Sequence, residues 1–265
     1  MRPEACRLVG DPIAAARDLL RGAARVVVLT GAGISAESGV PTFRGADGLW
    51  KTHRAEDLAT PEAFARDPRL VWEWYGWRRE VVAACMPNAA HVALAGATRE
   101  RPGMRIVTQN VDGLHAMAGG GGATPPLELH GSLFRSRCTR CDASWDDRHP
   151  VDASSVATLP RCLECGALAR PGVVWFGESL NPRVLAEAVR LASMADVCLV
   201  VGTSAVVYPA AGLADLTRRA GGAVVEINVA ATPLTDAATI SIRGTAASVI
   251  PALLRIEPLS EHSSP

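Results

Sequence analysis

The chain has 265 residues, of which 48% are hydrophobic, and its 27 Lys and Arg balance 27 Asp and Glu. This is the composition of a globular protein, so a largely disordered chain or a fibre is excluded. A net charge of zero argues against a large nucleic-acid footprint. No apolar run reaches the ~18 residues of a membrane-spanning helix, and the N-terminus lacks the apolar core of a signal peptide. We therefore expect a cytoplasmic protein that binds neither membranes nor nucleic acid.

Short apolar segments alternate with helical ones along the chain. The first expected helix, Pro12–Arg21, has Asp11 as its N-cap and precedes the first expected strand, Arg25–Thr30. The other expected elements are the strands Met104–Thr108, Val197–Val201 and Ala223–Asn228 and the helices Asn181–Met194 and Val207–Ala220. Strands that are apolar on both faces are typical of parallel sheets covered by helices. The pattern predicts an α/β fold with a Rossmann-like, doubly wound parallel sheet.

Two stretches interrupt this alternation. Residues 51–87 are rich in tryptophan and helical in period, whereas residues 134–173 contain two cysteine pairs and little periodicity. We predict that these stretches form a smaller domain, a helical insertion combined with a zinc module. Residues 1–50, 88–133 and 174–265 then form the larger, nucleotide-binding domain.

Four of the seven cysteines form two C-x2-C pairs, Cys138 with Cys141 and Cys162 with Cys165. In a chain without a secretion signal, such pairs are typical of a metal site rather than of disulfides. Four thiolates complete a tetrahedral zinc shell and leave no position for water. The spacing therefore predicts one structural Zn²⁺. Arginines beside the first pair are mixed with aspartates, so we expect no basic face for nucleic acid here.

The first expected strand runs directly into Gly31-Ala32-Gly33-Ile34-Ser35. Glycines after a strand allow a close backbone approach to a phosphate at a helix N-terminus. The full dinucleotide fingerprint requires a third glycine where Ala36 stands, so a tight strand-to-helix turn is the alternative interpretation. The following residues, 37–45, have no helical period and predict a long loop over a nucleotide, with Arg44 as a partner for pyrophosphate or ribose.

Polar residues follow several of the expected strands. Asn110 and Asp112 follow one, Thr203 and Asn228 stand at the ends of two others, and His130 ends a short apolar strand. Taken singly, such residues are common helix caps or turn residues. Together they lie at the carboxyl edge of the sheet, which is the ligand crevice of this fold class. Histidine is the usual general base near neutral pH.

Six motifs occur in order around the four cysteines: GAGISAESGVPTFRG (31–45), TQNVDGLH (108–115), ELHGS (128–132), VWFGE (174–178), GTS (202–204) and EIN (226–228). Together they resemble the sirtuins, which are NAD-dependent protein-lysine deacylases. The resemblance covers the chain from Arg25 to Leu254. It implies NAD as co-substrate, one structural zinc and acyl-lysine proteins or peptides as partners, with free lysine, nicotinamide and O-acyl-ADP-ribose as products.

The resemblance also implies roles for single residues. It implies that His130 is the base acting on a ribose hydroxyl, and that Asn110 and Asp112 lie near nicotinamide and its ribose. The residues implied in NAD binding are Gly31, Ala32, Gly33, Ile34, Ser35, Glu37, Thr42, Phe43, Arg44, Trp50, Gln109, Asn110, Val111, Asp112, Gly202, Thr203, Ser204, Asn228, Val229, Ala230 and Ala246. The residues that match the strand pairing with the substrate backbone, a case of β-augmentation, are Val174, Trp175, Phe176, Gly177 and Glu178.

Tyr75 and Arg78 stand three residues apart and share a face of an expected helix. From the pattern alone, a core aromatic beside a solvated arginine is the simpler interpretation. Tyr-x-x-Arg at this place nevertheless resembles the sirtuin branch, class III, that removes succinyl, malonyl and glutaryl groups, and Ala59 matches the small residue of that branch. The resemblance implies that a guanidinium and a phenol bind the acyl carboxylate, with deacetylation as a further activity.

Four other functions are weighed against this one. An oxidoreductase is disfavoured by the missing third glycine and the long loop after the first strand. A mono-ADP-ribosyltransferase is disfavoured by His130 and the expected acyl pocket. A non-enzymatic zinc module is disfavoured by the intact nucleotide loop. The remaining alternative is a deacetylase with weak activity on acidic acyl groups.

Overall fold

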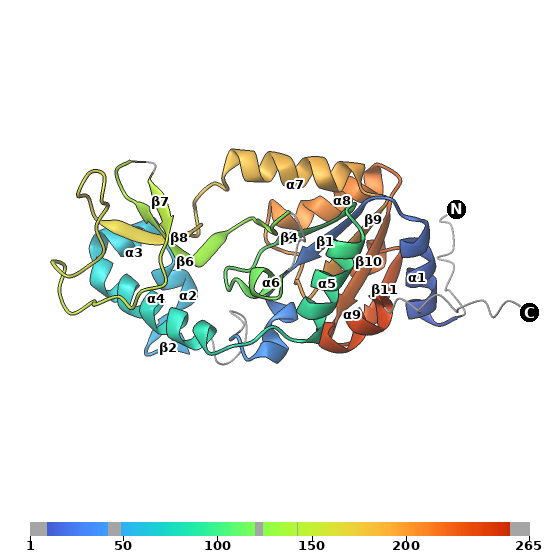
Figure 1. Ribbon diagram of the computed structural model, residues 1–265, viewed down its shortest axis with the longest axis horizontal. Coiled ribbons are helices and arrows are strands. Elements are labelled where there is room, and N and C mark those ends of the chain that lie inside the picture. The colour runs from blue at the N-terminus through green and yellow to red at the C-terminus, as the bar shows by residue number, and fades with distance from the viewer. Residues whose placement is uncertain (1–9, 42–48, 120–123, 142, 255–265) are drawn as a thin grey trace, which may run out of the picture.

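The computed structural model describes residues 10–41, 49–119, 124–141 and 143–254. Figure 1 shows a larger body around a parallel sheet and a smaller body around α2–α4 and β6–β8. The helices are α1 (Pro12–Gly22), α2 (Ala55–Leu58), α3 (Pro61–Arg66), α4 (Pro68–Ala83), α5 (Ala89–Glu100), α6 (Leu114–Met117), α7 (Pro182–Met194), α8 (Leu213–Arg219) and α9 (Ala246–Leu254). The strands are β1 (Val26–Thr30), β2 (Leu49–Trp50), β3 (His53–Arg54), β4 (Met104–Thr108), β5 (Leu127–Glu128), β6 (Gly131–Cys138), β7 (Ser144–Asp146), β8 (Ala169–Val173), β9 (Val197–Val201), β10 (Ala223–Asn228) and β11 (Ile240–Arg243).

The larger body contains a six-stranded sheet in the order β11-β10-β9-β1-β4-β5, and every neighbouring pair is parallel. The chain adds β4 and β5 on one side of β1, and then returns to add β9, β10 and β11 on the other. The strand order therefore reverses between β1 and β9. Ligands of open α/β sheets bind outside the carboxyl ends of the strands at such a switch point. The predicted doubly wound α/β fold is confirmed.

Helices cover both faces of this sheet (Figure 1). Val26 and Val28 of β1 belong to the core shared with α1, α5 and α9. Val27 and Leu29, which alternate with them, belong to the core shared with α7 and α8. Because successive side chains of a strand point to opposite faces, a strand buried on both sides is apolar throughout. This is the physical reason for the continuous apolar run in the sequence.

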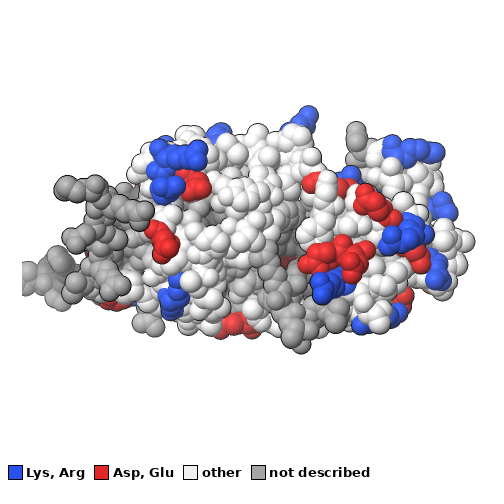
Figure 2. Space-filling view, turned by 180° about the vertical axis from the view of Figure 1, so that it is seen from behind, with Lys and Arg blue, Asp and Glu red and all other residues white. Residues whose placement is uncertain are grey.

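The smaller body packs α2–α4 against the three-stranded antiparallel sheet β7-β6-β8. Trp72 of α4 is fully buried, and its indole Nε1 donates to the Ala169 carbonyl of β8 over 3.0 Å. The core of this body includes Leu133 and Trp175, which lie just outside the predicted boundaries of the smaller domain. Those boundaries stay a prediction. On the face seen in Figure 2, Lys and Arg lie among Asp and Glu.

The structure differs from the sequence prediction in several elements. The helices α5 and α9 and the strand β11 are not predicted from the sequence. Of the helix expected over Val207–Ala220, the regular part begins only at Leu213, because Pro209 disfavours helical backbone at the residue before it. Within the described ranges, no helix has both the length and the apolar character needed to cross a membrane.

The segment Val174–Glu178 is a turn and not the strand expected from the sequence. Strand β8 ends at Val173, and the Glu178 backbone N then donates to the Trp175 carbonyl over 3.0 Å. Gly177 has a φ of 82° within this turn. Because L-residues with side chains rarely adopt that conformation, the glycine allows the chain to turn here. Pairing of this segment with a substrate backbone stays a prediction.

Candidate active site and metal centre

The loops after β1 and β9 approach each other closely at the switch point. The Gly33 backbone N donates to the Gly202 carbonyl over 2.7 Å. A Cβ on Gly33 would lie 2.7 Å from that carbonyl oxygen, and a Cβ on Gly31 would lie 2.7 Å from the Cβ of Thr203. The two glycines therefore allow two backbones to meet at the crevice. After β1 the chain forms the short 3-10 turns Ala32–Ile34 and Ala36–Ser38. Thr42, Phe43 and Arg44 lie outside the described residues.

Gly33→Ala is expected to destabilise the protein by about 1–3 kcal/mol, the usual cost of overpacking, because the new methyl group meets backbone atoms that cannot move aside. The affinity for NAD should fall at the same time, since the two loops that form the crevice are pushed apart. Thermal unfolding and calorimetric titration with NAD measure both effects. The matched control is Gly96→Ala in α5, where a Cβ meets no atom within 4 Å apart from the backbone of its own helix. A Gly33→Ala protein as stable as the control would contradict this explanation of the motif.

Three buried polar residues form a network beneath the loop after β1. The Ser35 hydroxyl donates to Asp112 Oδ2 over 2.8 Å and accepts from Asn110 Nδ2 over 3.1 Å. Asn110 Nδ2 also donates to the Gly31 carbonyl over 3.1 Å, and Asp112 Oδ1 accepts from the Leu114 backbone N. Because Gly31 offers a carbonyl, the amide of Asn110 must present its NH₂ to the loop. Its other atom, Oδ1, is an acceptor for a ligand hydroxyl or water.

His130 stands two residues after β5, half-buried, at the same edge of the sheet. Its Nδ1 lies 2.9 Å from the Gln109 carbonyl oxygen. Since a carbonyl only accepts, Nδ1 carries the proton in the neutral ring and the lone pair is on Nε2. Burial lowers the pKa of His130 below its ordinary value of 6.5, and the hydrogen bond to the Gln109 carbonyl partly opposes this shift. At neutral pH the ring is therefore held in the tautomer that can accept a proton at Nε2.

Polar side chains connect three of the strand ends, those of β4, β9 and β10. Gln109 Nε2 donates to Thr203 Oγ1 over 3.1 Å, and Asn228 Nδ2 donates to the Thr203 carbonyl over 2.8 Å. Beyond β10, Val229 is exposed. The carboxylate of Glu37 accepts from the Ala247 backbone N, which joins the loop after β1 to the first turn of α9. The other residues predicted at this edge are Ala32, Ile34, Val111, Ser204, Ala230 and the buried Ala246 at the start of α9.

Trp50, a predicted NAD contact, lies elsewhere in the described structure. Its ring packs in the core of the smaller body, with its centroid 6.3 Å from that of Trp77, and the Lys51 ammonium lies 4.5 Å from its centroid. The structure therefore does not bring Trp50 together with the polar residues at the strand ends. Its role toward NAD stays a prediction.

Two histidines that the sequence does not single out lie next to the network of Ser35, Asn110 and Asp112. His91 Nε2 is 3.4 Å from Ser35 Oγ, and the ring of His115 has its centroid 4.8 Å from that of His91. Thr30 Oγ1 donates to Thr108 Oγ1 and therefore accepts from His115 Nε2 over 3.0 Å. Burial lowers the pKa of His115 to about 3, so the ring is neutral. The two residues come from α5 and α6, and only the fold places them here.

The residues predicted to read the acyl group come together on α4. Tyr75 is fully buried, and burial raises the pKa of its phenol. The Arg78 guanidinium carbon lies 5.5 Å from the Tyr75 ring centre and 4.9 Å from that of Trp74. Burial lowers the pKa of Arg78 to about 10, an effect that Tyr75 and Asp112 oppose. The carboxylate of Asp112 thus favours the charged form of Arg78.

Ala59 and Phe176 lie next to each other on the same side. The Phe176 backbone N donates to the Ala59 carbonyl over 2.9 Å. Ala59 is buried in the core that contains Tyr75, whereas the Phe176 side chain is 53% exposed. The turn Val174–Glu178 therefore borders the predicted acyl pocket and presents an aromatic ring to the solvent.

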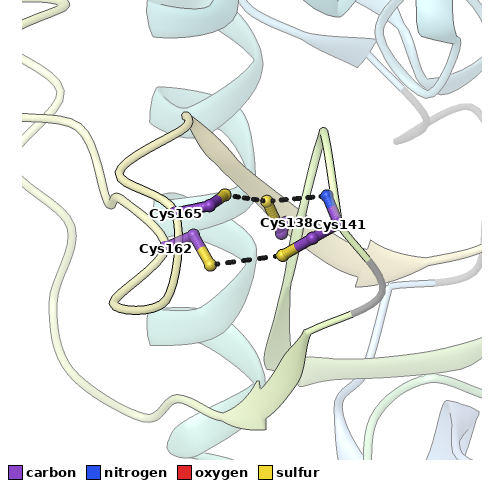
Figure 3. Close-up of side chains that lie close together, drawn as sticks. All are labelled: Cys138, Cys141, Cys162 and Cys165. Carbon is purple, nitrogen blue, oxygen red and sulfur yellow. Dashed lines mark hydrogen bonds between the residues drawn. The ribbon is translucent and has the colours of Figure 1, made fainter.

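Cys138, Cys141, Cys162 and Cys165 form a compact cluster (Figure 3). Their four Sγ atoms lie within 4.8 Å of one another, with 3.4 Å between Cys138 and Cys165. Backbone N–H groups of Cys141 and Arg140 donate to Cys138 Sγ and lower the pKa of its thiol to about 6, which favours the thiolate. Four sulfur donors at this spacing fit a tetrahedral Zn²⁺ and leave no open coordination position. The cluster is the structural zinc site.

Comparison with known proteins identifies the family. The Sir2 family model matches residues 31–209. "NAD-dependent protein deacylase 2" of Pyrobaculum aerophilum is 50% identical over 89% of this chain and 92% of its own length. A solved Sir2 homologue bound to NAD is 48% identical, with a TM-score of 0.84 over 91% of this chain and 92% of that one.

A second solved structure holds a peptide. It is a Sir2 mutant with a deacetylated p53 peptide and 3'-O-acetyl ADP ribose, and it is 35% identical, with a TM-score of 0.78 over 91% of this chain and 97% of that one. The family model covers more than half of the chain, and the similarity extends over almost the full length of each relative. This chain therefore belongs to the Sir2 family, the NAD-dependent protein deacylases known as sirtuins.

Proposed function

We propose that the chain is an NAD-dependent protein-lysine deacylase that prefers succinyl, malonyl and glutaryl groups and also removes acetyl groups. One observation carries the acyl preference: Tyr75 and Arg78 lie side by side on α4, with the Arg78 guanidinium carbon 5.5 Å from the Tyr75 ring centre. A half-buried guanidinium is poorly solvated, so a carboxylate that binds beside it stabilises its charge. Hydrogen bonds between such charged groups are stronger than neutral ones. The small Ala59 leaves room for an acyl chain longer than acetyl.

The chain's own residues supply binding, orientation and proton transfer. NAD, when bound, supplies the ribose carbon that takes the acyl oxygen and the ribose hydroxyl that later attacks the acyl carbon, with nicotinamide as the leaving group. Nε2 of His130 accepts the proton of that hydroxyl, because Nδ1 carries the ring proton and donates it to the Gln109 carbonyl. Asn110 Oδ1 and the Asp112 carboxylate hold hydroxyl or water positions next to the nicotinamide side of the crevice.

A peptide substrate binds along the edge formed by the turn Val174–Glu178 and the exposed Phe176. The backbone donors of Val174 and Phe176 are already used, toward the carbonyls of His130 and Ala59. A substrate strand would therefore bind to the remaining backbone groups of this segment, with its acyl-lysine reaching toward Ala59. The solved Sir2 structure with a deacetylated p53 peptide supports a peptide as the substrate class.

Replacing Tyr75 by Phe and Arg78 by Met together is expected to lower kcat/KM for a succinyl-lysine peptide at least about tenfold. Each lost charge-assisted bond is worth ~1.5–3 kcal/mol, and 1.4 kcal/mol corresponds to a factor of about ten. The loss should appear mainly as a higher KM. Activity on an acetyl-lysine peptide should change little or improve, because acetyl has no distal carboxylate and the pocket becomes more apolar.

The matched control is Arg69→Met, which removes a guanidinium from the same helix at a place where it binds the Ser154 carbonyl instead. Its ratio of desuccinylation to deacetylation should equal that of the unchanged protein. If the Tyr75 and Arg78 changes lower both activities in parallel, these residues support the fold and do not recognise the acyl group.

A further inference from the structure

Trp175 connects the turn after β8 to the acyl-recognition pair on α4. Its indole Nε1 donates to the Tyr75 hydroxyl oxygen over 3.0 Å, and both side chains are almost completely buried. An indole N–H can donate but cannot accept a hydrogen bond. Tyr75 is therefore the acceptor in this contact, so its own proton does not take part in this bond.

The direction of the indole N–H is set by its surroundings. The Arg170 guanidinium carbon lies 3.3 Å from the Trp175 ring centre, and the Phe64 ring centroid lies 5.4 Å away. Glu178 accepts from Arg170 Nη2 and from the Trp175 backbone N, each over 2.9 Å. Since the ring and its backbone are both held, Trp175 is oriented before any ligand arrives, which is the preorganisation that a recognition site needs.

We propose that Trp175 is a positioning residue for acyl recognition, which makes Tyr75 a hydrogen-bond donor toward the distal carboxylate of an acidic acyl group. The inference rests on the proposed function, because only such groups have a distal carboxylate. An ionised carboxylate accepts and never donates. A phenol whose oxygen already accepts from Trp175 has its proton available for that carboxylate, next to the Arg78 charge.

Trp175→Phe tests this role, because it removes the N–H and keeps an aromatic ring. We expect the KM for a succinyl-lysine peptide to rise about three- to tenfold, the range of one neutral hydrogen bond. The readout is the ratio of kcat/KM on succinyl-lysine to kcat/KM on acetyl-lysine, because any general effect of the change on folding or peptide binding is shared by both peptides, whereas this bond acts only on the distal carboxylate.

The matched control is Trp72→Phe, which removes a buried indole N–H from the same core but from a bond to the Ala169 carbonyl. It should lower thermal stability without changing the preference for succinyl over acetyl. Trp175→His retains a ring N–H and should recover part of the lost preference. Equal losses on the two peptides in Trp175→Phe would overturn the proposal.

A double-mutant cycle separates this proposal from the proposed function. If Trp175 acts through the Tyr75 hydroxyl, then Trp175→Phe added to Tyr75→Phe causes no further loss of succinyl preference. If the two losses multiply, the positioning role is wrong while acidic-acyl recognition by Tyr75 stands. If Tyr75→Phe alone leaves the preference unchanged, acidic-acyl recognition by Tyr75 is wrong, and the role of Trp175 fails with it.

Discussion

Replacing His130 by asparagine is expected to lower deacylation about 10²–10⁴-fold, the usual loss when a general base is removed. Asparagine can still donate to the Gln109 carbonyl, which His130 Nδ1 contacts over 2.9 Å, so the local structure should persist. It has no basic nitrogen at the position of Nε2. Binding of NAD should survive, because the residues proposed to hold NAD lie mainly in the loops after β1, β9 and β10. Steady-state kinetics and a calorimetric NAD titration measure both.

The control for this change is His149→Asn, since the His149 side chain is 93% exposed and lies in the smaller body. It should leave turnover unchanged. Near-normal turnover in His130→Asn would mean that another group is the base. Loss of NAD binding together with activity would mean that His130 supports the crevice.

The same assignment predicts the acid limb of the pH profile. A base works in its unprotonated form, so the rate falls as the pH falls through the pKa of His130. Burial holds that pKa below 6.5, so the pH at which kcat/KM falls to half of its plateau should lie below 6.5. Because partial unfolding in acid would also lower the rate, thermal unfolding should be followed over the same pH range. An acid limb centred above pH 6.5 in the folded protein would contradict the assignment.

Loss of the metal is expected to have the largest effect on stability. Cys162→Ser removes one of four sulfur ligands, and metal loss is among the few changes that cost more than about 4 kcal/mol. For a chain of this size the melting temperature should then fall on the order of 10 °C. Stability and activity should fall together, because Cys138 ends β6, Cys162 and Cys165 precede β8, and the turn beside the acyl pocket directly follows β8. A strong chelator should have the same effect on the unchanged protein.

Cys85→Ser is the matched control, since it makes the same atom change at a cysteine outside the cluster. A serine there can still donate to the Val81 carbonyl, as the Cys85 thiol does. Zinc content, measured by atomic emission, should stay at one per chain in Cys85→Ser and fall in Cys162→Ser. A zinc-free Cys162→Ser protein with full activity and an unchanged melting temperature would refute a structural metal.

The parallel sheet was predictable because its central strands are buried on both faces and short, a pattern that few other structures share. Helix α9 was not predictable in the same way, since Pro251 stands inside it and proline removes a helical hydrogen bond. Burial of Val249, Ile250 and Leu253 against the sheet compensates for that loss. Strand β11 is short and lies at the edge of the sheet, where one-sided burial weakens the pattern.

Helix α5 carried a signal that could have revealed it. Asn88 caps its first turn by accepting from the Ala90 backbone N, and Ala90, Leu94 and Ala97 recur on one buried face. Small residues weaken the hydrophobic contrast between the two faces, so the period is hard to see in the sequence.

The site was predictable where the topology alone brings residues together. Asn110 and Thr203 follow parallel strands and Asn228 ends one, and the carboxyl ends of such strands meet at one edge. Contacts between segments that are remote in sequence were not predictable. The bond from Trp175 to Tyr75 joins residues 100 positions apart, and His115 reaches Thr30 across 85 positions. The spacing of these residues carries no sign of either contact, because each contact forms only when the body that contains it folds.

The most direct measurement is product analysis by mass spectrometry, after the protein is incubated with NAD and matched peptides bearing acetyl-, succinyl-, malonyl- or glutaryl-lysine. We predict one nicotinamide and one O-acyl-ADP-ribose for each deacylated lysine, with faster turnover of the three acidic groups than of acetyl. Acyl removal without NAD consumption, ADP-ribose attached to the peptide, or formation of NADH would contradict the account.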